Sequence, residues 1–366
     1  MNAVGMLGSL GRRVDGVRTR WRTPYSGVWW VGEGVEWVID WYARELIRQL
    51  EASFGLSCRL APSCRGVRRQ VIHFASRNAY FSKGGEGLHP SNRAVLTWFR
   101  GSVEDPDPEN QRMIRLLPLH ASRFRTIVTA SSITRERLLA WGVPEKRVAL
   151  VPLGVDLSVF RPPKPGERKA VRARLGIPPG ALCIGSFQKD GIGWGEGMEP
   201  KPIKGPDVLL AVLERLRGRY PVFVLLTGPA RGYVKHGLER LGIDYRHVYF
   251  EHLEEVAACY RALDLCLITS RDEGGPMAVL EGLASGAPVV STRVGMAADL
   301  IRHGRTGGLV DVGDVEGLVA VASALLDDPG LRRRCIEEGL RTVEEYGWER
   351  IAQRYYAQVY QPLLGA

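Results

Sequence analysis

Short apolar runs alternate along this chain with longer segments in which apolar residues recur every three or four positions. Runs without a polar alternation are typical of strands that are buried on both faces of a parallel sheet. The predicted strands are 27–31, 70–75, 94–99, 125–131, 182–185, 222–228, 247–250, 263–268 and 288–292. Helical periodicity between them, as in 35–52 and 207–217, predicts an α/β protein made of strand–helix–strand crossovers.

The segment Leu263–Gly295 contains one complete crossover unit. Its first strand ends in the polar turn Ser270–Gly275, and Pro276 stands at the expected first helical position, where a missing N–H and a fixed φ are favourable. Gly286 is predicted to end this helix in the left-handed conformation. A helix that begins directly after a parallel strand offers N–H donors and a positive dipole to an anion.

Two carboxylates lie on this unit. Glu273 is in the turn, and Glu281 follows Met277 by four residues, so both helical residues share one face. A carboxylate can accept two hydrogen bonds from the vicinal diol of a ribose, and Gly274 and Gly275 leave the turn open to a sugar hydroxyl. The spacing alone is equally compatible with two solvated glutamates on a surface helix.

The run E-G-G-P-M-A-V-L-E-G-L-A-S-G-A-P-V-V, which begins at Glu273, resembles the signature of the family-four retaining glycosyltransferases. The resemblance extends from Val128 to the C-terminus and more loosely over Val28–Gly101. It implies the GT-B architecture, in which two Rossmann-like domains face a cleft and a last helix crosses back onto the first domain. The implied parts are a basic leader (1–22), an acceptor-side domain (23–160), a nucleotide-sugar domain (161–347) and the returning helix (348–366).

Composition agrees with two ordinary globular domains. The chain has 366 residues, 45% hydrophobic and 25% charged, which is enough for two separate cores. Its six cysteines include no C-x-x-C pair and lie mostly in apolar runs, a pattern that favours buried thiols in a reducing compartment over disulfides or zinc. No apolar run approaches the roughly 18 residues of a membrane helix.

The positive charge is confined to the first half of the chain. Residues 1–161 hold 24 Lys and Arg against 14 Asp and Glu, whereas residues 162–366 hold 26 of each kind. This excess is compatible with a basic surface that binds nothing, or with weak docking to anionic lipid headgroups or an anionic acceptor. Because the arginines neither cluster nor alternate with aromatic residues, nucleic acid is not expected. A cytoplasmic location follows, with peripheral attachment to the inner face of the membrane as the alternative.

Candidate residues in the first half are weaker. The resemblance places an acceptor-side glycine turn at Gly32–Gly34, although two glycines also suit any tight turn. Arg100 stands where the family commonly has a histidine that faces the donor sugar, so we predict contact with a phosphate or an acidic acceptor, or a surface position. Asp105-Pro-Asp107 has the D-x-D form of a metal motif, but prolines flank it and no strand precedes it, so we predict a solvated loop and no metal.

In the second half, the resemblance implies an arginine and a lysine that grip the donor diphosphate. Lys204, in the context K-G-x-D-x-L-L, matches the lysine. The arginine is absent, and Lys189, which lies before an inserted glycine-rich loop, is predicted to replace it, with Lys201 as the alternative. Two cations here would stabilise the charge that grows on a leaving diphosphate. The turn at Gly228 resembles the family's glycine turn beside the nucleotide, and Arg231 is predicted to reach the diphosphate or the base.

The predicted function is transfer of a hexosyl-type sugar, with retention of configuration, from a nucleotide-diphosphate sugar to a glycan, glycolipid or small-molecule acceptor, such as a polysaccharide or glycolipid precursor. Neither a metal nor a cofactor is expected. The predicted catalytic residues are Glu273, Lys204 and Lys189, and the predicted substrate-binding residues are Glu281, Gly274, Gly275, Pro276, Met277, Gly228, Arg231 and Arg100. A nucleotide-sugar epimerase, a phosphorylase and a non-catalytic nucleotide-binding protein are the alternatives. The base, sugar, acceptor, linkage and oligomeric state stay open.

Overall fold

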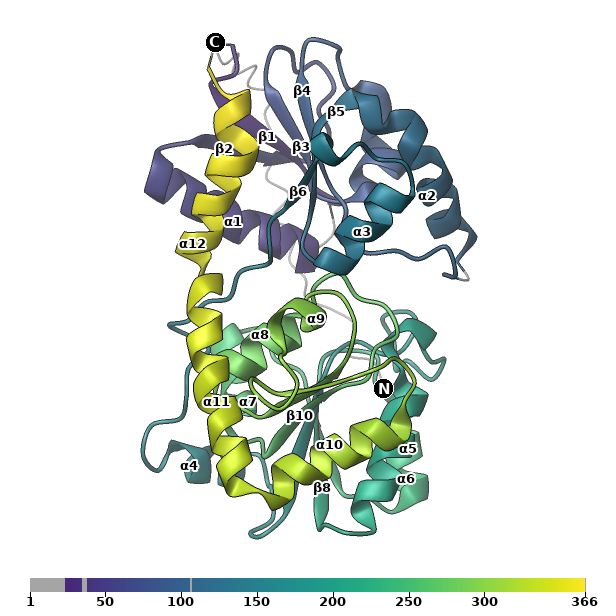
Figure 1. The fold of residues 1–366 in the computed structure, drawn as a ribbon, viewed down its shortest axis with the longest axis vertical. Coiled ribbons are helices and arrows are strands. Elements are labelled where there is room, and N and C mark those ends of the chain that lie inside the picture. The colour runs from purple at the N-terminus through teal and green to yellow at the C-terminus, as the bar shows by residue number, and fades with distance from the viewer. Residues whose placement is uncertain (1–23, 35–37, 106, 366) are drawn as a thin grey trace, which may run out of the picture.

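The computed structural model describes residues 24–34, 38–105 and 107–365. The predicted leader, 1–22, and the first residues of the helix predicted from position 35 lie outside these ranges. The described chain forms two α/β units, one above the other in Figure 1, each built around a six-stranded parallel sheet.

The first sheet has the strand order β2-β1-β3-β4-β5-β6. Its strands are β1 (Gly27–Val31), β2 (Ser57–Ala61), β3 (Val71–Phe74), β4 (Arg93–Thr97), β5 (Phe124–Thr129) and β6 (Val148–Leu150). The edge strand β2 was not predicted, because its sequence, SCRLA, lacks the continuous apolar run of the central strands, and none of its residues is buried. The sheet is covered by α1 (Val38–Phe54), α2 (Pro108–His120) and α3 (Ser132–Ala140).

The second sheet has the order β12-β11-β10-β7-β8-β9. Numbered from its own first strand, this is the 3-2-1-4-5-6 order of dinucleotide-binding folds. Its strands are β7 (Leu182–Phe187), β8 (Val222–Thr227), β9 (Tyr245–Val248), β10 (Leu265–Ile268), β11 (Val289–Thr292) and β12 (Gly308–Val310). The helices are α4 (Glu167–Arg174), α5 (Pro206–Arg217), α6 (Gly232–Leu241), α7 (Leu253–Arg261), α8 (Met277–Ala284), α9 (Ala297–Leu300), α10 (Val315–Asp327) and α11 (Pro329–Val343).

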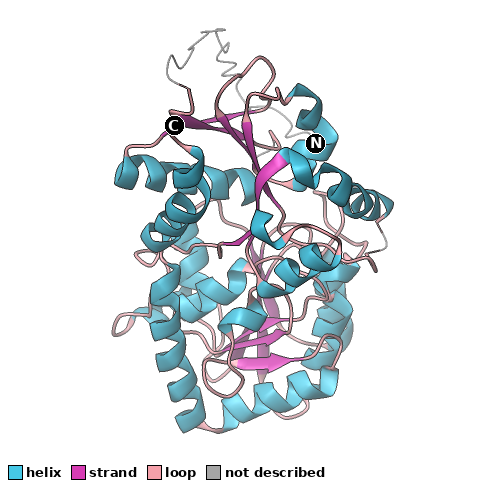
Figure 2. Ribbon diagram, turned by 45° about the horizontal axis from the view of Figure 1, so that its top comes forward, coloured by secondary structure: helices cyan, strands magenta, loops and turns pink. Residues whose placement is uncertain are grey.

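The last helix crosses from the second unit back to the first, as predicted. In Figure 1 the yellow ribbon leads upward from α11 through α12 (Trp348–Tyr355) and ends beside the first sheet. Figure 2 shows the same helical segment along one side of the molecule. The apolar positions that predicted this helix, Ile351, Tyr355, Val359 and Leu363, are all buried. Burial of this stripe joins the two units through one continuous hydrophobic cluster.

The Tyr360 hydroxyl anchors the returning segment inside the first unit. It lies 2.6 Å from Nδ1 of the buried His73, whose Nε2 lies 2.7 Å from the Thr97 hydroxyl. Burial lowers the pKa of His73 to about 3, so this histidine is neutral and fixes the tail by hydrogen bonding rather than by charge.

Two local predictions differ from the structure. Pro276 is the N-cap residue of α8 rather than its first helical residue, because its ψ of 103° is extended. The prediction of a solvated Asp105 is wrong, whereas Asp107 is exposed and caps α2 by accepting a hydrogen bond from the N–H of Glu109. Asp105 is 6% exposed and accepts hydrogen bonds from Asn110 and the N–H of Asp107.

All six cysteines are free thiols, and five of them are buried. Within the described ranges, no helix is both long and apolar enough to cross a membrane.

Candidate active site

The two sheets point the carboxyl ends of their central strands at each other. Each sheet has one point at which the strand order reverses, so that the connections on its two sides run toward opposite edges of the sheet. This point lies between β1 and β3 in the first sheet and between β7 and β10 in the second. Ligands of open α/β sheets bind outside the carboxyl ends of the strands at such points. Two cavities lie there, one of about 340 Å³ and one of about 790 Å³.

These two cavities collect most of the predicted site residues. The larger cavity, called the donor cavity below after the substrate that the sequence predicts for its residues, is lined by Lys189, Lys201, Lys204, Glu273, Gly275, Pro276, Met277 and Glu281. The smaller cavity, called the acceptor cavity, is lined by Arg100, Lys201, Lys204, Glu273, Gly274, Gly275 and Met277. Gly228 and Arg231 line neither of them.

The glycines of the turn before α8 are required by the opposite unit. A Cβ at Gly274 would stand 2.2 Å from the carbonyl oxygen of Phe99, and a Cβ at Gly275 would stand 2.5 Å from Leu153. Phe99 follows β4 and Leu153 follows β6, so both belong to the first unit. The two units therefore meet over this turn at a separation that only glycine allows.

Glu273 and Lys204, both predicted as catalytic residues, form an ion pair across the turn. The Ser270 hydroxyl also donates to the Glu273 carboxylate, at 3.0 Å. Lys204 lies in the segment that precedes α5. The close contact of Gly205 with the Thr269 carbonyl places this segment next to the end of β10. Both residues of the pair line both cavities.

Three lysines crowd the donor cavity. Burial, together with the charges of Lys204, Arg100 and Lys189, lowers the pKa of Lys201 to about 8. Burial also lowers the pKa of Lys189, whose ammonium lies 4.5 Å from the centre of the Trp194 ring. Such a cluster of cations favours a polyanion. Both candidates for the second cation, Lys189 and Lys201, are therefore in place.

Glu281 lies on the first helical turns of α8 and accepts a 2.7 Å hydrogen bond from the hydroxyl of Tyr260. Burial raises the pKa of Glu281 to about 7, and the Tyr260 hydrogen bond opposes part of this shift. The carboxyl group is thus held at the wall of the larger cavity by Tyr260.

Arg231 is not positioned as predicted. Its side chain is 1% exposed, and its guanidinium donates to Asp190 and to the carbonyls of Ser186 and Thr227 at 2.6–2.9 Å. Burial lowers the pKa of Arg231 and raises that of Asp190, while their mutual attraction opposes both shifts. Arg231 ties the ends of β7 and β8 together instead of reaching a ligand. Its buried position follows from a partner 41 residues earlier, which periodicity does not reveal.

Gly228 lies in the turn between β8 and α6 and does not line the cavity. It has a left-handed φ of 89°, and its carbonyl accepts a 2.7 Å hydrogen bond from His247. The neighbouring Pro229 lines the donor cavity, so the turn borders the site while Gly228 itself does not.

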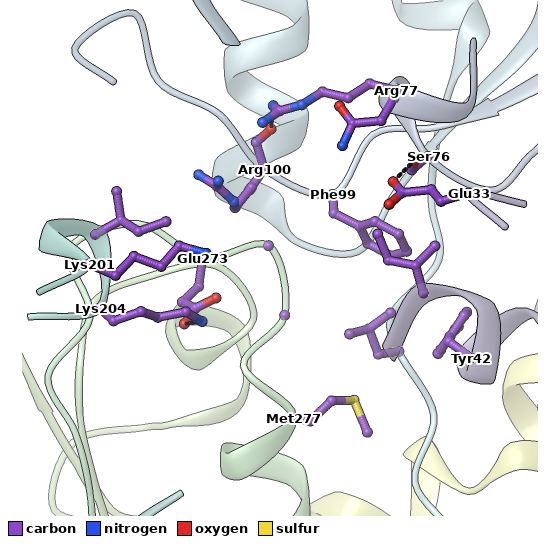
Figure 3. A pocket seen from close by; sticks show the side chains of 16 residues that line it. Glu33, Tyr42, Ser76, Arg77, Phe99, Arg100, Lys201, Lys204, Glu273 and Met277 are labelled. Carbon is purple, nitrogen blue, oxygen red and sulfur yellow. Dashed lines mark hydrogen bonds and ion pairs between the residues drawn. The ribbon is translucent and has the colours of Figure 1, made fainter. Parts of the chain in front are cut away.

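The acceptor cavity is basic on both sides, as Figure 3 shows. Arg77 and Arg100 come from the first unit, and Lys201 comes from the second and points toward them. Burial and the nearby Arg100 lower the pKa of Arg77 to about 10. Glu33, which receives a hydrogen bond from the Ser76 hydroxyl, lies on the same wall. This cavity offers cations for an anionic group and a carboxylate for a hydroxyl.

Sequence reasoning missed Arg77, Glu33 and Asp272. Arg77 and Glu33 each lie three residues or fewer after a central parallel strand, and that placement alone could have identified them. Asp272 binds Arg137 at 2.6 Å and Arg100 at 3.3 Å, which bridges the two units beside Glu273. No sequence signal pointed to this contact.

No group of three or more His, Cys, Asp or Glu side chains in the described part of the chain is arranged to hold a metal ion.

Residues 199–342 match the family model described as glycosyl transferases group 1. A D-inositol 3-phosphate glycosyltransferase from Thermobispora bispora is 31% identical over 260 residues, which are 66% of this chain and 56% of the relative. A protein of the same name from Arthrobacter sp. is 30% identical over 276 residues, 71% of this chain and 62% of the relative. The chain thus spans less than two thirds of the length of these relatives.

Solved structures share the fold at low identity. Anabaena Alr3699/HepE in complex with UDP and glucose has a TM-score of 0.71 and 15% identity, covering 91% of this chain and 99% of that one. Sucrose-phosphate synthase from Thermosynechococcus elongatus has a TM-score of 0.66 and 18% identity, covering 89% and 79%. These likenesses confirm the predicted GT-B architecture.

Proposed function

We propose that this chain transfers a sugar from a nucleotide-diphosphate sugar to an acceptor with retention of configuration, as a member of the glycosyl transferases group 1 family whose model matches residues 199–342. One observation carries the proposal: Glu273 and Lys204 lie together at the boundary between a lysine-rich cavity and a second, smaller cavity. Two substrates that bind on either side of this pair would meet at it.

The donor is assigned to the larger cavity. Glu281 accepts hydrogen bonds from the ribose hydroxyls, and Lys204 with Lys189 or Lys201 neutralises the diphosphate beside the N-terminus of α8. The Anabaena structure in complex with UDP and glucose has the same fold, which supports a nucleotide of this kind without fixing the base.

The reaction needs no nucleophilic side chain. The bond between the anomeric carbon and the diphosphate oxygen breaks, and the acceptor hydroxyl attacks from the same face. A diphosphate oxygen takes the hydroxyl proton. Lys204 stabilises the leaving diphosphate, and the Glu273 carboxylate stabilises the positive character that develops at the anomeric carbon.

The acceptor is assigned to the smaller cavity and carries an anionic group. Arg77, Arg100 and Lys201 would hold the anion while Glu33 accepts a hydrogen bond from a hydroxyl. Arg100 lies 3.4 Å from Asp105 and 3.3 Å from Asp272, longer than the roughly 2.7–2.9 Å of strong charge-assisted bonds, so a phosphate can compete for it. The relatives named D-inositol 3-phosphate glycosyltransferase act on a phosphorylated polyol, which agrees with this class of acceptor.

The proposal is tested by transfer assays with a panel of nucleotide-sugars, each combined with inositol 3-phosphate or unphosphorylated inositol. We expect turnover with the phosphorylated acceptor, and proton NMR of the product should show the donor's anomeric configuration. Arg100→Gln should raise KM for the phosphorylated acceptor about tenfold or more, the loss of one charge-assisted contact, with donor KM near wild type.

Arg112→Gln is the matched control, because Arg112 is an exposed arginine of the same unit whose ion pair with Glu109 lies on the surface of α2. Inversion of configuration would contradict the mechanism. Equal turnover with inositol 3-phosphate and inositol would contradict an anionic acceptor. If no nucleoside diphosphate raised the melting temperature of the protein, the proposed donor site would be contradicted.

A further inference from the structure

One cation of the acceptor cavity, Arg100, extends from a backbone segment that side chains hold in place. The segment 99–101 follows β4, and each of its three carbonyls accepts a hydrogen bond from a side chain. The donors are the Thr134 hydroxyl at 3.2 Å, the Arg77 guanidinium, and the Arg137 guanidinium at 2.9 Å. The origin of the Arg100 side chain is therefore fixed by contacts within the first unit.

The Arg100 guanidinium is held at one nitrogen, between carboxylates of different units. Its Nη1 lies 3.4 Å from Asp105 of the first unit and 3.3 Å from Asp272 of the second. A guanidinium is planar and carries its donors in a rigid fork, so holding one nitrogen sets the direction of the others. In Figure 3 this side chain lies between Arg77 and Lys201, on the wall of the acceptor cavity.

Asp272 is itself anchored on both units. It is 8% exposed, and its other carboxylate oxygen accepts a 2.6 Å hydrogen bond from Arg137 of α3. On its own unit, the N–H groups of Arg271 and Asp272 donate to the Ile203 carbonyl at 2.7 and 3.3 Å. Arg271 is also paired with Asp207 at 2.6 Å. The carboxylate thus stands on a fixed rim of the second unit and reaches across to the first.

A second carboxylate joins the same helix to the second unit at another place. Asp299 of α9 accepts hydrogen bonds from the Ser132 hydroxyl and from the Ser132 N–H, the latter at 3.0 Å. Of these two bridges between the units, the one at Asp272 includes Arg100. Asp299 therefore helps to close the units, whereas Asp272 also acts on a cation of the acceptor cavity.

We propose that Asp272 is a positioning residue for Arg100: it crosses from the second unit, is held by Arg137, and orients the Arg100 guanidinium toward the acceptor cavity. The anion-binding wall of this cavity is then complete only when the two units are closed. The inference rests on the proposed function and deepens its acceptor site, whose ligand here is the anionic group of the acceptor.

Asp272 has two effects of opposite sign on an anion bound by Arg100. Its negative charge repels the anion, whereas its contact with Arg100 orients the donors that bind it. A long side chain that is already oriented loses less rotamer freedom on binding. Asp272→Asn removes the charge and keeps the size, so the direction in which KM for the acceptor changes shows which effect is larger. Positioning raises this KM, and charge repulsion alone would lower it.

Steady-state kinetics of the full chain measure KM for inositol 3-phosphate and for the nucleotide-sugar separately. Asp272→Asn should raise the acceptor KM about 3- to 10-fold, a part of the effect expected for loss of Arg100 itself. The donor KM, and kcat at saturating acceptor, should stay near wild type. Inorganic phosphate, which presents the anion alone, should inhibit the variant more weakly by a similar factor.

Arg137→Gln tests the same contact from the first unit, at a side chain that is 31% exposed, should Asp272→Asn fail to fold. It should raise the acceptor KM similarly, and the double variant should be no worse than the weaker single variant, because both changes act through Arg100. Asp299→Asn is the matched control, since it weakens the other bridge between the units, and its acceptor KM should equal that of wild type.

Three results would overturn the inference: an unchanged or lowered acceptor KM in Asp272→Asn, additive losses in the double variant, or an equal increase in Asp299→Asn, which would assign the effect to closure alone. If wild type makes no product from inositol 3-phosphate, or as much from inositol, the anionic acceptor of the proposed function fails as well. Selective use of inositol 3-phosphate by wild type, with Asp272→Asn unaffected, removes this inference alone.

Discussion

At the scale of single residues, the burial of Glu281 in the donor cavity makes both ligand binding and the stability of the fold depend on its protonation. Glu281 has a pKa of about 7 in the folded chain against its ordinary value near 4.5. The folded state therefore holds a proton that the unfolded state has lost between these two values. Stability contributed by this group falls as pH rises through that interval. A ribose diol, by contrast, is bound best by the ionised carboxylate, whose population grows over the same interval.

Glu281→Gln should remove this pH dependence. We expect the melting temperature of the variant, relative to wild type, to rise between about pH 5 and pH 8, because the amide has no proton to lose. UDP affinity of wild type should increase over the same range, and that of the variant should be low throughout. Thermal unfolding and calorimetry at matched ionic strength measure both. Parallel melting curves for the two proteins would contradict the assignment of a raised pKa to Glu281.

At the scale of elements, the turn that starts α8 has two functions: it lines both cavities and it forms the contact between the units. Its glycines are fixed by Phe99 and Leu153 of the opposite unit. The carbonyl of Gly274 also accepts a 3.2 Å hydrogen bond from the N–H of Met296. A side chain added at either glycine should therefore increase the separation of the two units rather than disrupt the packing within one unit.

Gly274→Ala should hold the cleft open. The new Cβ would overlap the Phe99 carbonyl, an unyielding backbone atom, and such overpacking typically costs about 1–3 kcal/mol. We expect kcat/KM to fall at least tenfold and the radius of gyration from small-angle X-ray scattering to increase, while each unit keeps its secondary structure by circular dichroism. Gly195→Ala is the control, since nothing lies within 4 Å of a Cβ there. Full activity in Gly274→Ala would mean that the units need not approach as closely as they do here.

At the scale of the whole molecule, positive charge is unevenly divided between the halves of the chain. The net excess of +10 arises within residues 1–161. On the first unit, α2 carries the exposed Arg112 and Arg115, and Leu119 on the same helix is 75% exposed. Basic side chains next to an exposed leucine suit the surface of an anionic bilayer.

This asymmetry predicts weak, salt-sensitive binding to anionic vesicles. Each cation close to such a surface contributes about 1 kcal/mol to the binding free energy. At physiological ionic strength salt screens this attraction beyond a Debye length of roughly 8 Å. Cosedimentation with phosphatidylserine-containing vesicles should occur at low salt and fade as salt increases, with phosphatidylcholine vesicles as the control. Absence of binding at low salt, or binding that salt does not change, would contradict an electrostatic attachment.

The sequence by itself determined the central strands and helices and the candidate site residues of the turn before α8. Central strands such as β8 and β10 are apolar on both faces, and the turn between β10 and α8 combines a carboxylate, two glycines and a helix start within a few positions. These features are local, so periodicity and turn chemistry are sufficient to find them. The amphipathic last helix was equally visible, because its buried stripe repeats along one face.

Only the tertiary structure decided which residues meet. Strand order places β10 beside β7, and this neighbourhood pairs Lys204 with Glu273 across 69 positions of sequence. The same packing buries Arg231 against Asp190 and lets a loop backbone occupy the start of α6. A sequence pattern records which face of an element is apolar but not which element covers it. Partners far apart in the chain, and the charges that they cancel or leave uncancelled, are therefore fixed by packing alone.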